Sequence, residues 1–525
     1  MAKRFLRLNW RKCVFILLNA AVFALFSMME LYIQDEPFGR WWRKEIIVYG
    51  TVLCIIYAII LWHMYSLSDQ SLFMIDKSQG KKLHTLVFTM SLLCILPYIY
   101  LCLPGNIPYD TIPSIEYNLG IDRSNTMNPY MMNVLYGFVA RIGIRINSID
   151  VSIFLFLCVQ VVFILLAFSH CVAYATRSLS NYIMYTYLAI IFLIYFGVPS
   201  FAVYAFHLGK DSIFALNILI LTQMLLEYTI DSKAFLNDKR RVIILVVVSV
   251  GIGFTRNGAI WIPVLVSLCM AFQVKRDRKL WIGLVVTVWL FNAMMGACLQ
   301  KEEVPIRESI SLPIQQTAAI MKKHQSDINE SDKKFVYSYL PAEAINSYNP
   351  QLADPVKNEF PSSLTIVEMM QFLEKWVDLI IQYPDDAAKA VINMTYGYYC
   401  PLAECDNSKP LLYIGIKRRS RLIQATTDIT WENFDHQGLL SHWGAVLRNT
   451  SVLGVWMKPG IYTWLLIMIT MNTLYKKRYQ RLTALLPLWC VLLGCLCSPV
   501  NGYYRYMLPI IWTTPLIIPS VMCFK

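Results

Sequence analysis

Four groups of charged side chains stand in otherwise apolar or turn-forming sequence, and their types could support chemistry. A carboxylate can accept a proton from a hydroxyl group, and a guanidinium or ammonium group can hold a phosphate. The four are Asp110 in LPGNIPYDTIPSIEYNLG, then His207, Lys210 and Asp211 in FAVYAFHLGKDSIF, then Arg256 in GFTRNGAIW, and Arg505 in SPVNGYYRYMLPI.

Each group also has a purely structural explanation that the sequence leaves open. Asp110 follows a Pro-Gly pair and a second proline, so it can equally be a solvated turn acid or a helix N-cap. Lys210 and Asp211 can cap the helix that follows them. Arg256 can pair with a nearby carboxylate, and Arg505 can extend its side chain towards water.

The elements that must position these groups are mostly apolar. Hydrophobic residues make up 57% of the 525 residues and charged residues only 15%, against about 25% in soluble domains. This excludes a soluble enzyme, a disordered protein and a small secreted disulfide-rich domain. Apolar runs long enough to cross a membrane recur along the chain, at about 13–33, 46–66, 84–103, 151–173, 181–199, 210–230, 242–256, 259–273, 281–298, 459–474, 482–498 and 505–522. The prediction is an all-α polytopic membrane protein with about 12 transmembrane helices.

The distribution of basic residues predicts which side each loop faces. The first segment, MAKRFLRLNWRK, is strongly basic, and basic residues then gather in alternate short loops such as 233–241, 275–279 and 476–481. Because cytoplasmic loops are enriched in Lys and Arg, we expect both termini in the cytoplasm and the protein in the cell membrane. The same bias explains the net charge of +13 without nucleic acid as a partner. The stretch 242–273 is interrupted at Thr255-Arg256-Asn257-Gly258 and predicts a helical hairpin.

Two predicted outer segments are too long to be simple connections. They divide the chain into an N-terminal helix pair (1–83), a transmembrane core (84–298) with a first outer loop at 104–150, an extracytoplasmic domain (299–458) and C-terminal transmembrane helices (459–525). The first outer loop also holds Glu116 and Asp122, and its stretch 129–142 predicts an amphipathic helix in the membrane interface. The chemistry is therefore expected to face outwards.

No motif in the chain predicts a metal site or a cofactor. Histidines of the large outer segment form neither an HExxH sequence nor a cluster, so we predict no cofactor and leave a divalent metal open. Cys400 and Cys405 bracket the sequence PLAE on the predicted oxidising side. They could form a disulfide there or remain two thiols.

Several sequence segments, taken in order, resemble a bacterial family of membrane proteins of the GT-C glycosyltransferase type. They are LPGNIPYDTIPSIEYNLG, HLGKDSIF, TRNGAIW, SLPIQQTAAI, YNPQLADPVK, WVDLIIQYPDDAAKAVIN with YGYYCP, and NGYYRYMLPI, and they span about 100 to 515. An outward-facing aspartate after an early span is similar to the GT-C superfamily as well. One departure is that relatives often have His-His-Pro where this chain reads Met127-Asn128-Pro129, which puts a role for a histidine there in doubt.

The resemblance implies a GT-C-like fold and an inverting transfer of a sugar from a polyprenyl-phosphate-linked donor to a cell-envelope glycan or lipid, on the outer face of the membrane. It implies that Asp110 is the general base and Asp211 a second carboxylate. Cations are needed on the lipid-phosphate leaving group, for which Arg256, Arg505 and Lys210 are candidates, while Glu116, Asp122 and His207 are candidates for binding the acceptor. The sequence leaves open an envelope-glycan polymerase or ligase, and a lipid-linked-sugar flippase or other transporter.

Overall fold

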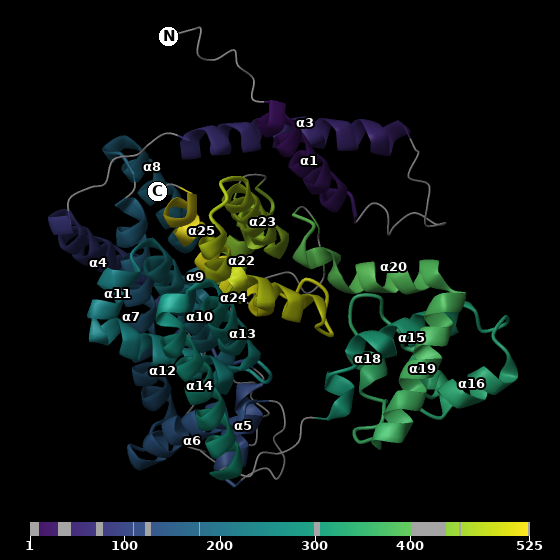
Figure 1. Ribbon diagram of the computed structural model, residues 1–525. Coiled ribbons are helices and arrows are strands. Elements are labelled where there is room, and N and C mark those ends of the chain that lie inside the picture. The colour runs from purple at the N-terminus through teal and green to yellow at the C-terminus, as the bar shows by residue number, and fades with distance from the viewer. Residues whose placement is uncertain are drawn as a thin grey trace.

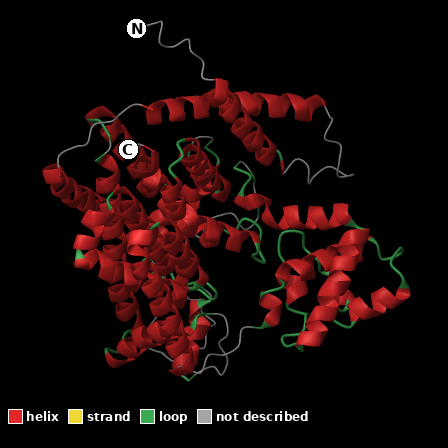
Figure 2. Ribbon diagram, viewed as in Figure 1, coloured by secondary structure: helices red, strands yellow, loops and turns green. Residues whose placement is uncertain are grey.

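The computed structural model describes residues 10–29, 44–69, 77–108, 110–120, 128–177, 179–298, 305–401, 403, 405, 437–450 and 453–522. In these residues the fold is helical, with isolated β-bridges and no strand (Figures 1 and 2). Figure 1 shows a large helical bundle, a pair of N-terminal helices across one side of it, and a smaller group of helices beside it.

The N-terminal pair consists of α1 (Trp10–Ser27) and α3 (Lys44–Asp69), which pack against each other. The Phe23 ring lies 4.3 Å from that of Trp464, so the pair also contacts the C-terminal helices. Many of its large apolar side chains stay exposed, including Leu18, Val48 and Ile55. An apolar surface of this kind is expected where a helix faces lipid.

The bundle is built around α10 (Lys210–Ile230), which packs against α7, α12, α24 and α25. Its other helices are α4 (Lys77–Leu101), α7 (Ile149–Thr176), α8 (Asn181–Phe192) with η2 (Leu193–Gly197), α9 (Pro199–Ala205), α11 (Ser232–Asn237), α12 (Lys239–Thr255), α13 (Trp261–Gln273), η3 (Lys275–Asp277), α14 (Arg278–Cys298), α23 (Pro459–Tyr475), α24 (Tyr479–Leu496), η7 (Tyr504–Met507) and α25 (Leu508–Met522). α10 is mostly apolar between its ends and is largely buried, as a central helix must be.

The structure supports a helical membrane protein, whereas the predicted number of spans stays a prediction. In the described residues a helix covers at least part of each predicted apolar run. Six helices in the described residues are long and apolar enough to cross a membrane, and α8–η2 with α9 makes up to seven if this pair, bent by 64°, is one span. Some of the others are short: α13 has 13 residues and α25 has 15, below the roughly 20 that a perpendicular span needs.

Two shorter helices follow α4 and cover part of the first predicted outer loop. They are α5 (Thr111–Asn118) and α6 (Tyr130–Arg145), which pack against each other, and α6 also packs against α7 and α12. The expected amphipathic helix is present, since α6 buries Tyr136 and Ala140 and exposes Phe138 and Ile144. Together they form the part of the fold that positions Asp110.

The smaller group, called here the α15–α20 domain, has its own core. Its elements are η4 (Ile306–Glu308), α15 (Ser311–Lys323), α16 (Glu330–Tyr337), α17 (Ala342–Asn346), α18 (Asp354–Lys357), α19 (Ile366–Gln382), α20 (Pro384–Thr395) and η5 (Tyr396–Tyr398). Stacked and edge-on contacts join Tyr339, Phe360 and Phe372. A capping box of Thr365 and Glu368 begins α19.

The α15–α20 domain is joined to the bundle near the start of the last helix. Ala353 N donates to Pro499 O at 2.8 Å, and Asn501 N donates to Gln351 O at 2.9 Å. Gly397 lies against Gly502, which has a φ of +60°, and a Cβ atom on Gly397 would come within 2.8 Å of the Gly502 Cα. The predicted domain 299–458 also contains α22 (Gln437–Arg448) and η6 (Gly454–Met457), and its boundaries stay a prediction.

Candidate functional site

Two loops that are far apart in sequence pair at one end of the bundle. Asn106 N donates to Phe206 O at 3.2 Å, and Leu208 N donates to Asn106 O at 2.8 Å. The Thr111 hydroxyl then donates to Leu208 O at 2.8 Å across 97 residues of sequence. This pairing holds the start of α5, and with it Asp110, beside the start of α10, which carries Lys210 and Asp211.

Arg505 joins the two carboxylates of these loops. Its Nη2 lies 2.6 Å from Asp110 Oδ2, and its Nε lies 3.7 Å from Asp211 Oδ2. The side-chain exposures are 6% for Arg505, 14% for Asp110 and 4% for Asp211, so this cluster is largely desolvated. Three of the residues picked out from sequence thus lie in one site, and Arg505 does not extend towards water.

The structure shows whether the Asp110 side chain caps the helix that follows it. Asp110 stands at the N-cap position of α5 but makes no side-chain capping hydrogen bond. Its carboxylate is held by Arg505 instead. The Asp110 side chain is therefore part of an ion pair and is neither a solvated turn acid nor a helix cap.

Arg256 and Lys210 add positive charge to the same region. The Arg256 guanidinium lies 4.7 Å from the centre of the Tyr506 ring, and that of Arg505 lies 5.6 Å from it, so one ring contacts both groups. Lys210 is half-buried, and Asp110, Asp211, Arg505 and Arg256 all act on it electrostatically. In the described residues no carboxylate lies within ion-pair distance of Arg256, which leaves it suited to an anion.

An apolar groove leads away from Arg256. It has a volume of about 340 Å³ and lies between α13, α24 and the turn at Arg256–Gly258. Trp261, Leu265 and Leu493 line it, and they are 61%, 45% and 60% exposed. A guanidinium at the head of an exposed apolar groove is suited to a molecule with an anionic head and a hydrocarbon chain.

His207 is buried beside the cluster rather than open to a ligand. It is 1% exposed, and neither ring nitrogen has a hydrogen-bond partner among the described residues. Its ring meets that of Tyr204 edge-on, with the ring centres 5.3 Å apart. Burial, and secondarily the charge of Arg505, lower the pKa of His207 to about 3, so the imidazole is neutral.

This lowered pKa predicts a pH-dependent stability. Between the unfolded pKa of about 6.5 and the folded pKa, only the unfolded chain binds the proton, so acid favours unfolding. By pH 5 the expected loss is about 2 kcal/mol. Thermal unfolding of the protein between pH 7.5 and pH 5 should show a smaller fall in Tm for His207→Asn than for the wild type. The exposed His63 supplies the control, since His63→Asn should keep the wild-type pH dependence. Equal pH dependence in the His207 variant would contradict the prediction.

The two other residues predicted to bind the acceptor are Glu116 and Asp122. Glu116 is buried on α5, at 7% exposure, and Asp122 lies outside the described residues.

The structure adds two residues that the sequence did not single out. The Asn128 side chain donates to Asp110 O at 2.7 Å and to Ser114 Oγ at 2.5 Å, and Tyr136 is fully buried where the charges of Asp110 and Asp211 act on it. The contacts of Asn128 support the start of α5.

The predicted disulfide is not formed in the structure. Cys400 and Cys405 are both thiols, buried at 1% and 2% exposure. Cys400 Sγ donates to Ser27 O, while Cys405 Sγ accepts from Asn501 Nδ2, each at 3.4 Å. The two sulfur atoms are therefore held by different parts of the fold, and their closeness in sequence was a poor guide. The described residues contain no group of three or more His, Cys, Asp and Glu placed to hold a metal ion.

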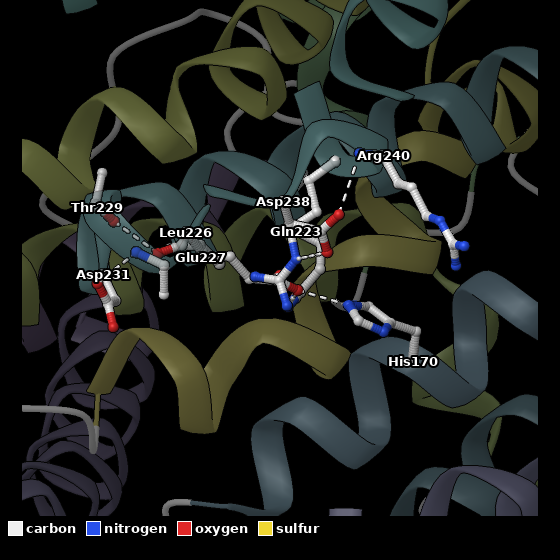
Figure 3. Close-up of polar contacts among 10 residues, drawn as sticks. His170, Gln223, Leu226, Glu227, Thr229, Asp231, Asp238 and Arg240 are labelled. Carbon is white, nitrogen blue, oxygen red and sulfur yellow. Dashed lines mark hydrogen bonds and ion pairs between the residues drawn. The ribbon is translucent and has the colours of Figure 1, made fainter. Parts of the chain in front are cut away.

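A second buried charge cluster lies at the other end of α10. Glu227, at 4% exposure, accepts from His170 at 2.6 Å and from Gln223 at 2.9 Å, and pairs with Arg241 at 3.2 Å (Figure 3). Along the helix Glu227 is about 25 Å from Asp211. The cluster joins α7, α10 and α12, and it is structural rather than part of the site.

The site therefore combines two carboxylates, of which Asp211 is buried and Asp110 half-buried, with three cations and an adjoining apolar groove, drawn from segments spread over most of the chain. No curated protein and no solved structure matches this chain. The sequence model described as a family of unknown function, DUF6020, matches residues 51–523. That range takes in every residue of the site, and the chain belongs to this family.

Proposed function

We propose that this protein is a membrane glycosyltransferase of the GT-C type, which transfers a sugar from a polyprenyl-phosphate-linked donor to an acceptor of the cell envelope. The observation that carries the proposal is the Asp110–Arg505–Asp211 cluster, with Arg256 and Lys210 beside it. Inverting glycosyl transfer from a lipid phosphate needs a carboxylate to take the acceptor proton and cations to hold the leaving group. The cluster supplies both.

The proposed reaction begins with an exchange of partners at Arg505. The donor phosphate draws the guanidinium away from Asp110, because a phosphate is also a good bidentate partner for arginine. The released carboxylate oxygen then accepts the hydrogen of the acceptor hydroxyl. The hydroxyl oxygen bonds to the anomeric carbon, the bond from that carbon to the phosphate oxygen breaks, and the proton passes to Asp110. The lipid phosphate leaves with the electron pair, held by Arg505, Arg256 and Lys210.

The apolar groove at Arg256 fits the lipid part of such a donor. Its exposed walls of Trp261, Leu265 and Leu493 would contact an isoprenoid chain that enters from the membrane. A lipid donor also accounts for a site built among apolar helices rather than in a soluble domain. The site would face the outer side of the cell membrane, with both termini in the cytoplasm, as the loop charges predict.

Replacing Arg256 with alanine should weaken use of the donor. In a dry site each cation on the leaving group stabilises the transition state by several kcal/mol, so kcat/KM for the lipid-linked sugar should fall by about 10²-fold or more. Arg256→Lys should restore only part of the lost kcat/KM, because an ammonium group cannot make the bidentate contact that a guanidinium makes to a phosphate. Steady-state kinetics with a short-chain polyprenyl-phosphate sugar give the measurement. If Arg256→Ala keeps normal donor affinity and turnover, the role of Arg256 is structural and consists of its contacts with the rings of Phe214 and Tyr506.

The proposed function itself is tested by reconstitution. The full-length protein in lipid vesicles is given a panel of polyprenyl-phosphate sugars, with envelope extract as acceptor, and the release of polyprenyl phosphate is followed by mass spectrometry. Release that depends on both the protein and the acceptor supports a glycosyltransferase. Release only from an oligosaccharide-diphosphate donor would favour the polymerase or ligase. No release from either donor would contradict the proposal.

One observation favours a transporter as the second candidate. The helix pair α8–η2 and α9 is bent by 64°, and the chain leaves α9 directly into the site through His207. Broken helices beside buried charges are typical of transporters. The reconstituted vesicles distinguish the two, because a transporter would move an intact lipid-linked sugar or another solute across the bilayer without cleaving it.

A further inference from the structure

A small pocket lies beside the turn that carries Arg256, between α6, α12 and α14, and α12 packs against both of the other helices (Figure 1). Its volume is about 100 Å³, below the roughly 300–1,000 Å³ of sites for drug-sized molecules. It therefore fits at most a single sugar ring. The residues that define it, called here the amide pocket, include Tyr130, Gly253, Phe254, Asn257, Asn292 and Gly296.

Glycines open the amide pocket. A Cβ atom on Gly253 would come within 2.8 Å of the Asn292 amide, so a side chain at this position would displace Asn292. A Cβ atom on Gly296 would meet no atom within 4 Å. Gly296 lies within α14, where glycine is less favourable than almost any other residue. The space beside Gly296 is thus open although the helix itself favours a side chain there.

Amide and hydroxyl groups supply the polar part of the pocket. Asn292 donates one hydrogen bond within its own helix, from Nδ2 to Val288 O at 3.0 Å, which leaves its second N–H and its oxygen for a ligand. Asn257 is exposed, and Tyr130 and Asn292 are half-buried, so a ligand can reach all three side chains. Groups that both donate and accept hydrogen bonds are what the hydroxyls of a sugar require.

The pocket offers no partner to a charged group. The described residues that line it include no charged side chain. Phe254 and Met295 give it apolar walls, against which the C–H face of a sugar can pack. A carboxylate on the sugar would lose water without meeting a cation here, which is costly. The lining therefore favours a neutral sugar over an acidic one.

The position of the pocket fits the sugar of a lipid-linked donor. Asn257 lines both the amide pocket and the apolar groove, and it directly follows Arg256. On α6, Tyr130 lies two positions after Asn128, whose side chain donates to Asp110 O at 2.7 Å. In the donor the sugar is bonded to the phosphate, and its anomeric carbon is the atom that the acceptor attacks. The sugar must therefore lie between the phosphate and the base, and the amide pocket adjoins the segments that carry both.

We propose that the amide pocket holds the sugar of the lipid-linked donor and that this sugar is neutral. The inference rests on the proposed function for the word donor, whereas binding of the sugar can be measured without any transfer. The three parts of the donor then lie in order: the hydrocarbon chain in the apolar groove, the phosphate at Arg256, and the sugar at Asn257 and Asn292. The groove and Arg256 bind any polyprenyl phosphate, and the amide pocket selects the sugar.

Binding is tested by calorimetry with the full-length protein in detergent. The probes are farnesyl phosphate and its esters with glucose, mannose, N-acetylglucosamine and galacturonate. At least one neutral ester should bind about tenfold or more tightly than farnesyl phosphate, because the sugar adds several hydrogen bonds and an apolar contact. The galacturonate ester should gain no such affinity.

Two substitutions test whether the gain comes from the amide pocket. Gly296→Leu fills the pocket and Asn292→Ala removes one of its amides, so each should abolish the gain of the neutral ester and leave the affinity for farnesyl phosphate unchanged. Leucine is a better helix former than glycine, so the Tm of Gly296→Leu should be at least that of the wild type. Gly283→Leu is the matched control. Gly283 is an exposed glycine of the same helix with equally open surroundings, and its variant should bind every probe as the wild type does.

The outcomes separate this inference from the proposed function. If no neutral ester binds more tightly than farnesyl phosphate, or if the galacturonate ester binds most tightly, the inference is overturned, whatever the protein catalyses. It is also overturned if Gly296→Leu weakens farnesyl phosphate as much as the neutral ester. If the neutral ester binds through Gly296 and Asn292 but no transfer is found, the sugar site stands and the glycosyltransferase falls. If transfer is found, Asn292→Ala should raise KM for that donor and leave KM for the acceptor unchanged.

Discussion

Replacing Asp110 with asparagine is expected to lower the turnover of sugar transfer by about 10²–10⁴-fold, with donor binding retained. Asparagine keeps the shape of the side chain and can still accept a hydrogen bond from Arg505, so the loop between α4 and α5 should hold its conformation. It cannot take a proton from the acceptor hydroxyl. Single-turnover kinetics with saturating donor separate this loss of chemistry from a loss of binding.

The control is Asp385→Asn, which removes an exposed carboxylate at the start of α20, and it should transfer sugar at the wild-type rate. If Asp110→Asn also keeps the wild-type rate, Asp110 has no part in the reaction. Asp211 would then be the next carboxylate to test, because the same guanidinium holds it.

The helical course of this chain could be predicted well because a membrane span is specified locally. A run of apolar residues carries its own signal, and the backbone must satisfy its hydrogen bonds within the run. Even the interruption at Arg256 was readable, because it is polar and contains a glycine. Gly258 has a φ of +74° and turns the chain between α12 and α13. The number of membrane crossings was less readable, because α25 contains Pro515 and Pro519 and has only 15 residues.

The composition of the site could be predicted in part, but its geometry could not. Asp110, Asp211 and Arg505 are ionisable residues in apolar surroundings, and such residues are rare enough to stand out. That one guanidinium would hold both carboxylates depends on contacts across 395 residues of sequence, which no local pattern encodes. Nothing in the sequence pattern marks Tyr506, whose ring contacts Arg256 and Arg505.

Two features were not predicted from the sequence because they depend on contacts between distant parts of the chain: the separate partners of Cys400 and Cys405, and the contacts of Asn128. Cys400 and Cys405 are near neighbours in sequence, yet the fold gives each a separate partner. Asn128 stood out only as a departure from His-His-Pro, whereas its amide contacts the Asp110 carbonyl and the Ser114 hydroxyl at the start of α5. In both cases the decisive contact comes from a side chain or carbonyl elsewhere in the fold.

Replacing Arg505 with glutamine is expected to destabilise the protein by about 3–5 kcal/mol and to abolish transfer. The guanidinium is the cation that both Asp110 and Asp211 contact, and all three side chains are at most 14% exposed. Removing it leaves two carboxylates close together in a desolvated site, where each raises the cost of the other's charge. Thermal unfolding of the full-length protein in detergent should show a clearly lower Tm.

The cause of that loss can be tested by removing one of the stranded charges. In Arg505→Gln/Asp211→Asn only one of the two carboxylates that lost the guanidinium remains charged, so the double variant should be more stable than Arg505→Gln alone, although it stays inactive. Arg276→Gln, which removes an arginine whose side chain is 70% exposed, should leave the Tm unchanged. If the second substitution lowers the Tm further, the guanidinium stabilises the fold through packing against Tyr503 and Tyr506 rather than by compensating Asp110 and Asp211. Arg505 neutralises two carboxylates in the protein without donor, and in the proposed reaction the same guanidinium binds the donor phosphate. Substitution of Arg505 should therefore change both the stability of the protein and its affinity for the donor.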